Sequence, residues 1–287
     1  MFGFLNIYKP KGMTSHDVVS VLRRITKIKQ IGHTGTLDPF AEGVLPICIG
    51  KSTRLIEYLE DDKAYIGTVQ FGKATDTYDI DGTVTKTSDK KISLAEIESV
   101  LSDFRGEIEQ KPPIYSAIKI KGKKLYELAR AGKKDIEIPS RRVYISKLEI
   151  VSFNPQQQSL ELTVECSKGT YIRSIANDIG ERLGVCGHLT KLVRIKAGKF
   201  LLENSTPLAS INTVDDIQKL LINPLEYLDY PKYEINPTEQ KKISNGMSIK
   251  IPLPDGISLM TVNNNIAAVG KCKSNIFECD KVFINNN

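Results

Sequence analysis

The sequence predicts an α+β protein in two unequal parts, and three observations support this prediction. Stretches with apolar residues at every second position alternate with stretches of helical spacing, without a regular repeat. Two prolines interrupt the pattern in DYPKYEINPTE (229–239), and a β-rich stretch follows them. The chain has 287 residues, 40% of them hydrophobic, which is enough for two cores. We therefore expect a large domain over 1–230 and a small one over 231–287.

The first part begins with a strand, FLNIYK (4–9), followed by a helix that Thr14 or Ser15 can cap. AYIGTVQFG (64–72) predicts a second strand. Ser93 with Glu96 three residues later forms a capping box, which predicts that a helix begins there.

Further along, KKLYELARAG (123–132) predicts a short helix closed by Gly132. LELTVEC (160–166) has the period of a strand, and after SKGTYIR a helix is expected with an apolar stripe. That stripe consists of Ile172, Ile175, Ile179 and Leu183. Beyond the prolines we expect a short helix and then the strands SIKIPL, ISLMTV, IAAVGKC and IFECDKVFI.

The net charge is only +6, but the positive charge is concentrated. Lys111 to Arg142 holds ten Lys and Arg against three Asp and Glu. The ranges 9–30 and 168–199 are each basic by five, so the rest of the chain is acidic. A basic run alone is usually a solvated face, but three of them favour a polyanion partner such as nucleic acid.

Several classes of protein are disfavoured. The five cysteines are scattered without a Cys-x-x-Cys pair, and only three histidines accompany them, so we expect reduced thiols and no metal site. No apolar run approaches the roughly 20 residues that cross a bilayer, and the N-terminus lacks the order of a secretory signal. We expect a cytoplasmic protein that does not bind membranes.

GVLPICIGKST (43–53) ends like a phosphate-binding loop but has the wrong spacing. Six residues, rather than four, separate its glycines, and they form an apolar run. We therefore interpret GKST as the end of a buried strand and disfavour an NTPase.

Asp38 is the only carboxylate in TGTLDPFA, a loop punctuated by glycine and proline. An aspartate before proline is a common turn residue, so turn formation is one interpretation. Chemistry is the other, because Tyr171 and Arg173 in GTYIR lie on one face if extended, and an arginine favours an ionised carboxylate. Tyr65 in KAYIGTV is a third candidate, although a strand tyrosine is more often part of a core.

Four long blocks of the chain resemble the bacterial tRNA pseudouridine synthase B family, in that family's order. They are GHTGTLDPFAEGVLPICIGKSTR, KAYIGTVQFGKATDTYDIDG, PPIYSAIKIKGKKLYELARAG and CSKGTYIRSIANDIGERLG. The resemblance implies the pseudouridine synthase fold, with a mixed, mainly antiparallel sheet flanked by helices and a PUA-like C-terminal domain. It implies an isomerase that converts uridine 55 in the T-loop of tRNA, without a metal or soluble cofactor. We expect a monomer, although the sequence itself leaves the oligomeric state open.

The same resemblance assigns roles to single residues. Asp38 matches the catalytic aspartate, and Arg173 is its expected ion-pair partner. Tyr65 is expected to stack on the extruded uracil and to help remove the C5 proton. His33 would fill the place that the base leaves, and Asp79 would contact the uracil or the tyrosine. Two further residues are expected to bind substrate, Tyr171 and Lys9.

The basic insertion at about 105–145 is expected to clamp the RNA. The resemblance implies that this RNA is the T-arm of tRNA. Phosphate contacts are expected from Lys119, Lys121, Lys123 and Lys124. The contribution of the C-terminal domain to RNA binding stays open.

Two other functions compete with this one. The first is a non-catalytic RNA-binding protein or tRNA chaperone on the same scaffold. The second is a glycoside hydrolase that pairs Asp38 with Asp79 or Asp81, which fits poorly because the chain has no tryptophan to line a sugar site.

Overall fold

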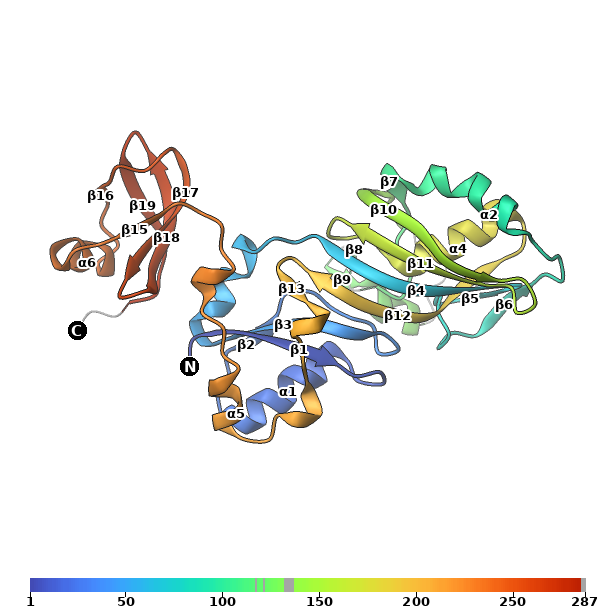
Figure 1. The fold of residues 1–287 in the computed structure, drawn as a ribbon, viewed down its shortest axis with the longest axis horizontal. Coiled ribbons are helices and arrows are strands. Elements are labelled where there is room, and N and C mark those ends of the chain that lie inside the picture. The colour runs from blue at the N-terminus through green and yellow to red at the C-terminus, as the bar shows by residue number, and fades with distance from the viewer. Residues whose placement is uncertain (117, 121, 132–136, 285–287) are drawn as a thin grey trace.

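The computed structural model describes residues 1–116, 118–120, 122–131 and 137–284, and Figure 1 shows a large and a small sheet. The strands of the large sheet are β1 (Gly3–Lys9), β2 (Ile31–His33), β3 (Glu42–Ile49), β4 (Lys63–Phe71), β7 (Gly106–Gln110), β10 (Arg141–Asn154), β11 (Ser159–Cys166), β12 (Gly187–Ala197), β13 (Phe200–Leu201) and β14 (Thr206–Pro207). Their order is β14-β1-β3-β12-β4-β11-β10-β7, with β2 beside β3 and β13 beside β12. Within the described residues, β1 with β14 and β3 with β12 are the parallel pairs, so the sheet is mixed and mainly antiparallel.

Helices cover both halves of this sheet (Figure 1). Near β1 and β2 lie α1 (Ser15–Thr26) and α5 (Val214–Lys219), whereas α2 (Leu94–Leu101) and α4 (Ile172–Leu183) lie near β10 and β11. The predicted cap at Ser93 is confirmed: its hydroxyl accepts a hydrogen bond from the Glu96 amide, and the Glu96 carboxylate accepts one from Ser93. Thr14 caps α1 in the same way with Asp17.

Shorter elements connect these. They are the 3₁₀ helices η1 (Gly50–Tyr58), η2 (Ser102–Phe104), η3 (Leu202–Asn204), η4 (Leu208–Ser210) and η5 (Pro224–Glu226), the hairpin of β5 (Lys73–Thr75) with β6 (Val84–Thr87), and, in the basic insertion, β8 (Lys119–Ile120), β9 (Lys123–Lys124) and α3 (Leu125–Arg130). The helix expected from Lys123 therefore begins at Leu125, because the two lysines pair with β8; its expected end, Gly132, is outside the described residues.

Two sequence interpretations are wrong in detail. Gly50 to Thr53 do not end a strand, because β3 ends at Ile49 and these residues open η1, where Gly50 has a φ of 65°. Tyr171 and Arg173 do not share an extended face, because α4 starts at Ile172 and Tyr171 is its N-cap. The turn of the helix, rather than strand alternation, directs the Arg173 side chain.

The small sheet has the order β15-β17-β18-β19-β16. Its elements are β15 (Lys232–Glu234), β16 (Ile249–Lys250), β17 (Gly256–Val262), β18 (Asn265–Lys273) and β19 (Ile276–Val282), with α6 (Pro237–Ser244) packed against it. The β-rich C-terminal part is thus confirmed, including its short helix. The boundary between residues 230 and 231 stays a prediction.

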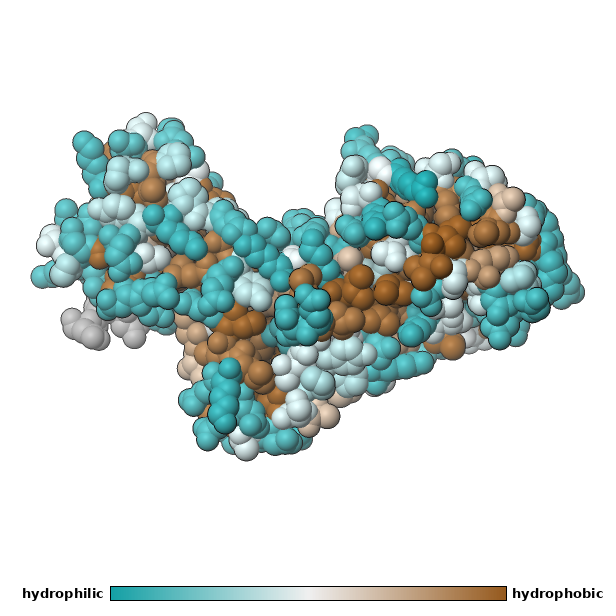
Figure 2. All heavy atoms as spheres, viewed as in Figure 1, coloured by the Kyte–Doolittle hydropathy of each residue, from teal (hydrophilic) through white to brown (hydrophobic). Residues whose placement is uncertain are grey.

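The small sheet joins the rest of the molecule through η1. The Tyr58 hydroxyl donates a hydrogen bond to Asp280, and Arg54 donates one of 3.0 Å to the carbonyl of Val282. Phe4, Leu55 and residues of β17 and β18 form one shared hydrophobic cluster there. Hydrophobic residues gather at this junction in the space-filling view (Figure 2).

The helix that carries Arg173 is seated by a contact between glycines. A Cβ on Gly180 would lie 2.3 Å from the backbone of Cys186 and Gly187, at the start of β12. Only a residue without a side chain allows α4 to approach the sheet this closely.

We expect Gly180→Ala to lower the free energy of unfolding by about 1–3 kcal/mol, the usual cost of overpacking. Glu181→Ala, on the exposed side of the same helix, serves as the control and should change it by less than about 0.5 kcal/mol. Urea denaturation compares the two; equal effects would contradict the seating of α4 on this glycine.

Candidate active site

Asp38 lies in the loop between β2 and β3, and the loop is fixed by hydrogen bonds to the start of the chain. The amide of Leu37 donates to the Ser15 hydroxyl at 2.8 Å, and that hydroxyl is 3.2 Å from the Leu37 carbonyl. The amide of Gly12 donates to the carbonyl of Pro39 at 2.8 Å. Residues on both sides of Asp38 are therefore anchored, while its own side chain stays 31% exposed.

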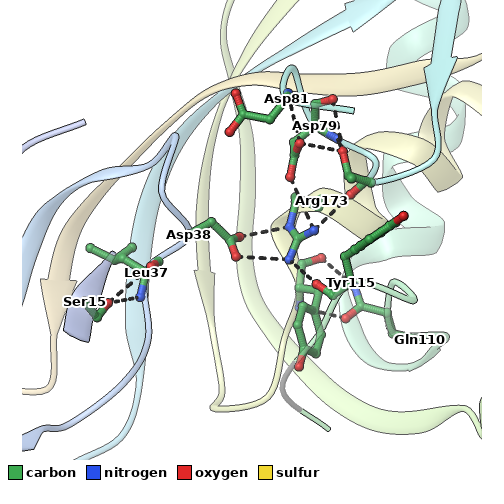
Figure 3. Close-up of polar contacts among 10 residues, drawn as sticks. Ser15, Leu37, Asp38, Asp79, Asp81, Gln110, Tyr115 and Arg173 are labelled. Atoms are coloured by element: carbon green, nitrogen blue, oxygen red, sulfur yellow. Dashed lines mark hydrogen bonds and ion pairs between the residues drawn. The ribbon is translucent and has the colours of Figure 1, made fainter. Parts of the chain in front are cut away.

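Arg173, in the first turn of α4, reaches Asp38 from across the sheet. Its Nε lies 2.9 Å from Asp38 Oδ2, and its Nη2 donates to Asp38 Oδ1 at 3.1 Å (Figure 3). This two-point contact fixes the plane of the carboxylate. Because the arginine side chain is only 5% exposed, water screens the pair weakly.

A second carboxylate, Asp79, contacts the same guanidinium. Its Oδ2 is 3.3 Å from Arg173 Nη1, and its Oδ1 accepts hydrogen bonds from the Thr77 hydroxyl and the Asp81 amide (Figure 3). Burial raises the pKa of Asp79, although the Thr77 hydrogen bond and Arg173 oppose this. Asp79 is 7% exposed, so it supports Arg173 from behind rather than facing solvent.

Two tyrosines border this cluster. Tyr65 on β4 is buried, which raises the pKa of its hydroxyl to about 12. Burial also raises the pKa of Tyr171, whose backbone exchanges two hydrogen bonds with the side chain of Gln110. Tyr171 is the N-cap of the helix that carries Arg173. Tyr65 is the register partner of Arg194, which donates a hydrogen bond to the Gly35 carbonyl in the Asp38 loop.

Lys9 and His33 lie deeper than their expected roles suggest. Lys9 is fully buried, and its Nζ donates to the carbonyls of Pro10 and Met13 at 2.9 and 2.7 Å. His33 is half-buried, its Nδ1 lacks a hydrogen-bond partner among the described residues, and burial lowers its pKa, which favours a neutral ring. Substrate contacts of both residues stay predictions.

The expected phosphate-binding lysines are only partly described. Lys119 and Lys124 pair in the hairpin of β8 and β9, Lys123 is exposed beside them, and Lys121 lies outside the described residues. The structure thus brings Asp38, Arg173, Asp79, Tyr65 and Tyr171 together, and it leaves the lysine contacts as predictions.

Sequence reasoning missed three residues that complete the site. The carbonyls of Thr77 and Tyr115 accept hydrogen bonds from Arg173 at 2.9 and 3.0 Å, and Gln110 holds the start of α4. Backbone acceptors leave no signal in a sequence, since any residue type supplies them. Gln110 had a signal, a polar residue at the end of a strand, but nothing showed its partner.

No group of three His, Cys, Asp or Glu residues in the described part of the chain is placed to hold a metal ion. No helix there is long and apolar enough to span a membrane.

Chemically, the cluster offers one partly exposed carboxylate that pairs with an arginine on an anchored loop, in a site bordered by a buried tyrosine. Such a carboxylate can attack or stabilise an electron-poor carbon, or accept a proton.

Comparison with solved structures confirms the expected fold class. A chain in the crystal structure of a Cbf5-Nop10-Gar1 complex superposes with a TM-score of 0.72 at 24% identity, covering 99% of this chain and 85% of that one. A chain of an H/ACA RNP bound to a substrate RNA containing 2′-deoxyuridine gives 0.71 at 23% identity, with the same coverage. The class defined is that of the pseudouridine synthase fold.

Sequence comparison then identifies the family. Residues 23–172 match the N-terminal domain of the TruB family pseudouridylate synthases, and 173–239 match the tRNA pseudouridylate synthase B C-terminal domain. The tRNA pseudouridine synthase B of Geobacillus thermodenitrificans is 46% identical over 263 residues, 88% of this chain and 87% of that protein. That of Lactobacillus johnsonii is 40% identical over 297 residues, 99% of both chains. The chain belongs to the tRNA pseudouridine synthase B family, whose members are isomerases.

The buried Lys9 generates a prediction about pH. Burial, with a contribution from Arg194, lowers the pKa of Lys9 to about 8 against an ordinary 10.5, although Asp38, Glu42 and Asp17 oppose this. Between these values the unfolded chain binds more protons than the folded one, so stability gained from this group rises with pH. The free energy of unfolding of the parent should therefore increase from pH 8 to 10.5 by up to about 3 kcal/mol relative to Lys9→Met.

Urea denaturation at several pH values measures this difference. Lys29→Met, which removes an exposed lysine, should follow the parent. Parallel curves for the parent and Lys9→Met would contradict a buried lysine with a lowered pKa.

Proposed function

We propose that this isomerase converts uridine 55 in the T-loop of tRNA to pseudouridine, with Asp38 as the catalytic carboxylate. The observation that carries the proposal is the contact between Arg173 and Asp38, which holds both carboxylate oxygens at 2.9 and 3.1 Å and yet leaves the side chain 31% exposed. A group held in this way is oriented and accessible to a substrate.

The reaction needs one such carboxylate and no cofactor. The bond between C1′ and N1 of the uridine breaks, the uracil turns, and its C5 joins C1′; the proton leaves C5 and N1 gains one, so atoms and electrons balance. Asp38 can act by attacking C1′ or by assisting loss of the base. Because the departing uracil is also the incoming nucleophile, the second carboxylate of ordinary glycosidases is not required.

Tyr65 is proposed to stack on the uracil. Reaching a base inside a folded T-loop requires its extrusion, at a cost of a few kcal/mol in lost stacking, and an aromatic ring recovers part of that cost. A hydroxyl with a pKa of about 12 is protonated at neutral pH, which supports stacking more strongly than proton removal. His33 is proposed to take the place that the base leaves.

Binding of the tRNA is proposed to come from the basic insertion. Lys119, Lys121, Lys123 and Lys124 would contact phosphates, which gives salt-dependent affinity, and the shape of the T-arm would give specificity. We further propose that the protein acts as a monomer in the cytoplasm, with domains over 1–230 and 231–287.

The competing glycoside hydrolase is poorly supported by the geometry. It would need Asp79 or Asp81 as a second carboxylate facing the same sugar, whereas Asp79 is buried behind Arg173 and binds the guanidinium that also binds Asp38. A purely RNA-binding role does not account for the ion pair that holds the partly exposed carboxylate of Asp38 in one orientation.

We predict that Asp38→Asn abolishes turnover, because an amide is neither a nucleophile nor a base, while tRNA binding stays within a few-fold of the parent. The test is to incubate parent and variant with an unmodified tRNA transcript and to map pseudouridine. Asp81→Asn, which removes a neighbouring carboxyl outside the ion-pair cluster, is the matched control. Absence of pseudouridine with the parent, or activity of Asp38→Asn within tenfold of it, would refute the proposal.

A second prediction concerns Tyr65. Tyr65→Phe keeps the stacking ring and should retain a turnover rate within about tenfold of the parent, whereas Tyr65→Leu should lose most of it because stacking on a base contributes about 1–3 kcal/mol. Single-turnover rates decide between the roles. If Tyr65→Phe instead forms the new carbon–carbon bond but retains the RNA, the hydroxyl removes the C5 proton.

A further inference from the structure

Arg194 on β12 is a charged side chain at the centre of the fold that the proposed chemistry does not use. It is fully buried, and no carboxylate of the described residues forms an ion pair with it. An arginine stays protonated inside proteins, and burying its charge without a counter-ion is costly. The backbone groups that this side chain binds therefore indicate which part of the fold it stabilises.

Those hydrogen bonds join the two ends of the loop that carries Asp38. Arg194 Nε donates to the carbonyl of Val44 at 2.6 Å, and Nη2 donates to the carbonyl of Gly35 at 3.1 Å. One carbonyl precedes Asp38 and the other follows it. The planar guanidinium thus fixes the distance between the start and the end of this loop. The ammonium group of a lysine, on a flexible stem, would not hold two acceptors in a fixed geometry.

The backbone of Arg194 is equally close to the loop. Arg194 pairs with Gly43 in the parallel register of β12 and β3. Gly43 has a φ of 105°, and a Cβ there would lie 2.3 Å from the Arg194 carbonyl oxygen. The chain that leaves the loop therefore rejoins the sheet directly beside Arg194.

The remaining nitrogen, Nη1, is buried without a hydrogen-bond partner among the described residues. It lies 3.7 Å from the position that a Cβ on Gly35 would take, so it is directly below the loop. On the other side, Arg194 is the register partner of Tyr65, and its charge opposes the effect of burial on that hydroxyl. The same guanidinium thus binds the backbone of the Asp38 loop and acts electrostatically on the hydroxyl of Tyr65.

We propose that Arg194 is a positioning residue for the reaction: it bonds both ends of the Asp38 loop and sets the place of that carboxylate relative to Tyr65. This inference rests on the proposed role of Asp38. Arg173 binds the carboxylate of Asp38 itself, whereas Arg194 binds the backbone carbonyls of Gly35 and Val44 on either side of it in the chain.

The test measures kcat and KM for an unmodified tRNA with Arg194→Met and Arg194→Lys. We expect Arg194→Met to lower kcat at least 100-fold and to change KM less than threefold, because a small displacement of a catalytic group costs about this much while phosphate contacts persist. Arg194→Lys keeps the charge but not the two-point contact, so it should recover part of the rate and stay at least tenfold below the parent.

Gln158→Met is the control for loss of a buried polar clamp. Gln158 is 4% exposed and bonds the backbone of Ile92 and Pro155, at a turn between β10 and β11. It should lower the melting temperature but leave kcat of the folded protein within threefold. If Arg194→Met does not fold, the result for Arg194→Lys decides.

A kcat for Arg194→Lys within tenfold of the parent would overturn the inference. So would a loss that appears in KM rather than kcat, or an equal loss of kcat in Gln158→Met. A parent that forms no pseudouridine in tRNA would instead overturn the proposed function, together with the reaction that this inference needs.

Discussion

The guanidinium of Arg173 lies between the carboxylates of Asp38 and Asp79, and removing either partner would leave buried charge without full compensation. Contacts in the surrounding structure hold these three residues in position. The glycine contact at Gly180 sets how deeply α4 carries Arg173 into the sheet, and Gln110 fixes the first residue of that helix. Asp79 binds the arginine on its buried side, and Asp38 binds it on the partly exposed side.

Most of the fold could be predicted because local signals agreed with tertiary packing. Strand alternation in β4 and β11 and the capping box at Ser93 all correspond to elements of the structure. The interpretation failed where a short segment had two options. Gly50 to Thr53 follow an apolar strand and resemble its end, but the left-handed backbone at Gly50 turns them into η1. The position of such a turn depends on what the segment packs against, here the small sheet.

The site was only partly predictable, for a different reason. The residue types and their flanking motifs indicated Asp38, Arg173 and Tyr65, while composition and spacing alone left turn formation and core packing open. The backbone carbonyls that hold Arg173 could not be predicted, since they carry no sequence identity. Arg194 had a faint signal, a basic residue in the apolar alternation of LVRIKA, but long basic side chains often reach solvent from such positions.

The strand order has a consequence for how the proposed active site forms during synthesis. β3 lies between β1 and β12 although some 140 residues separate it from the latter, and β14 completes the edge beside β1. The ribosome therefore releases the loop of Asp38 long before the helix and strand that hold it. Non-local pairing of this kind is slow to form, and the early segments must wait with apolar edges exposed. A nascent chain truncated before α4 would contain every residue of the loop but neither of the two arginines that hold it, Arg173 and Arg194.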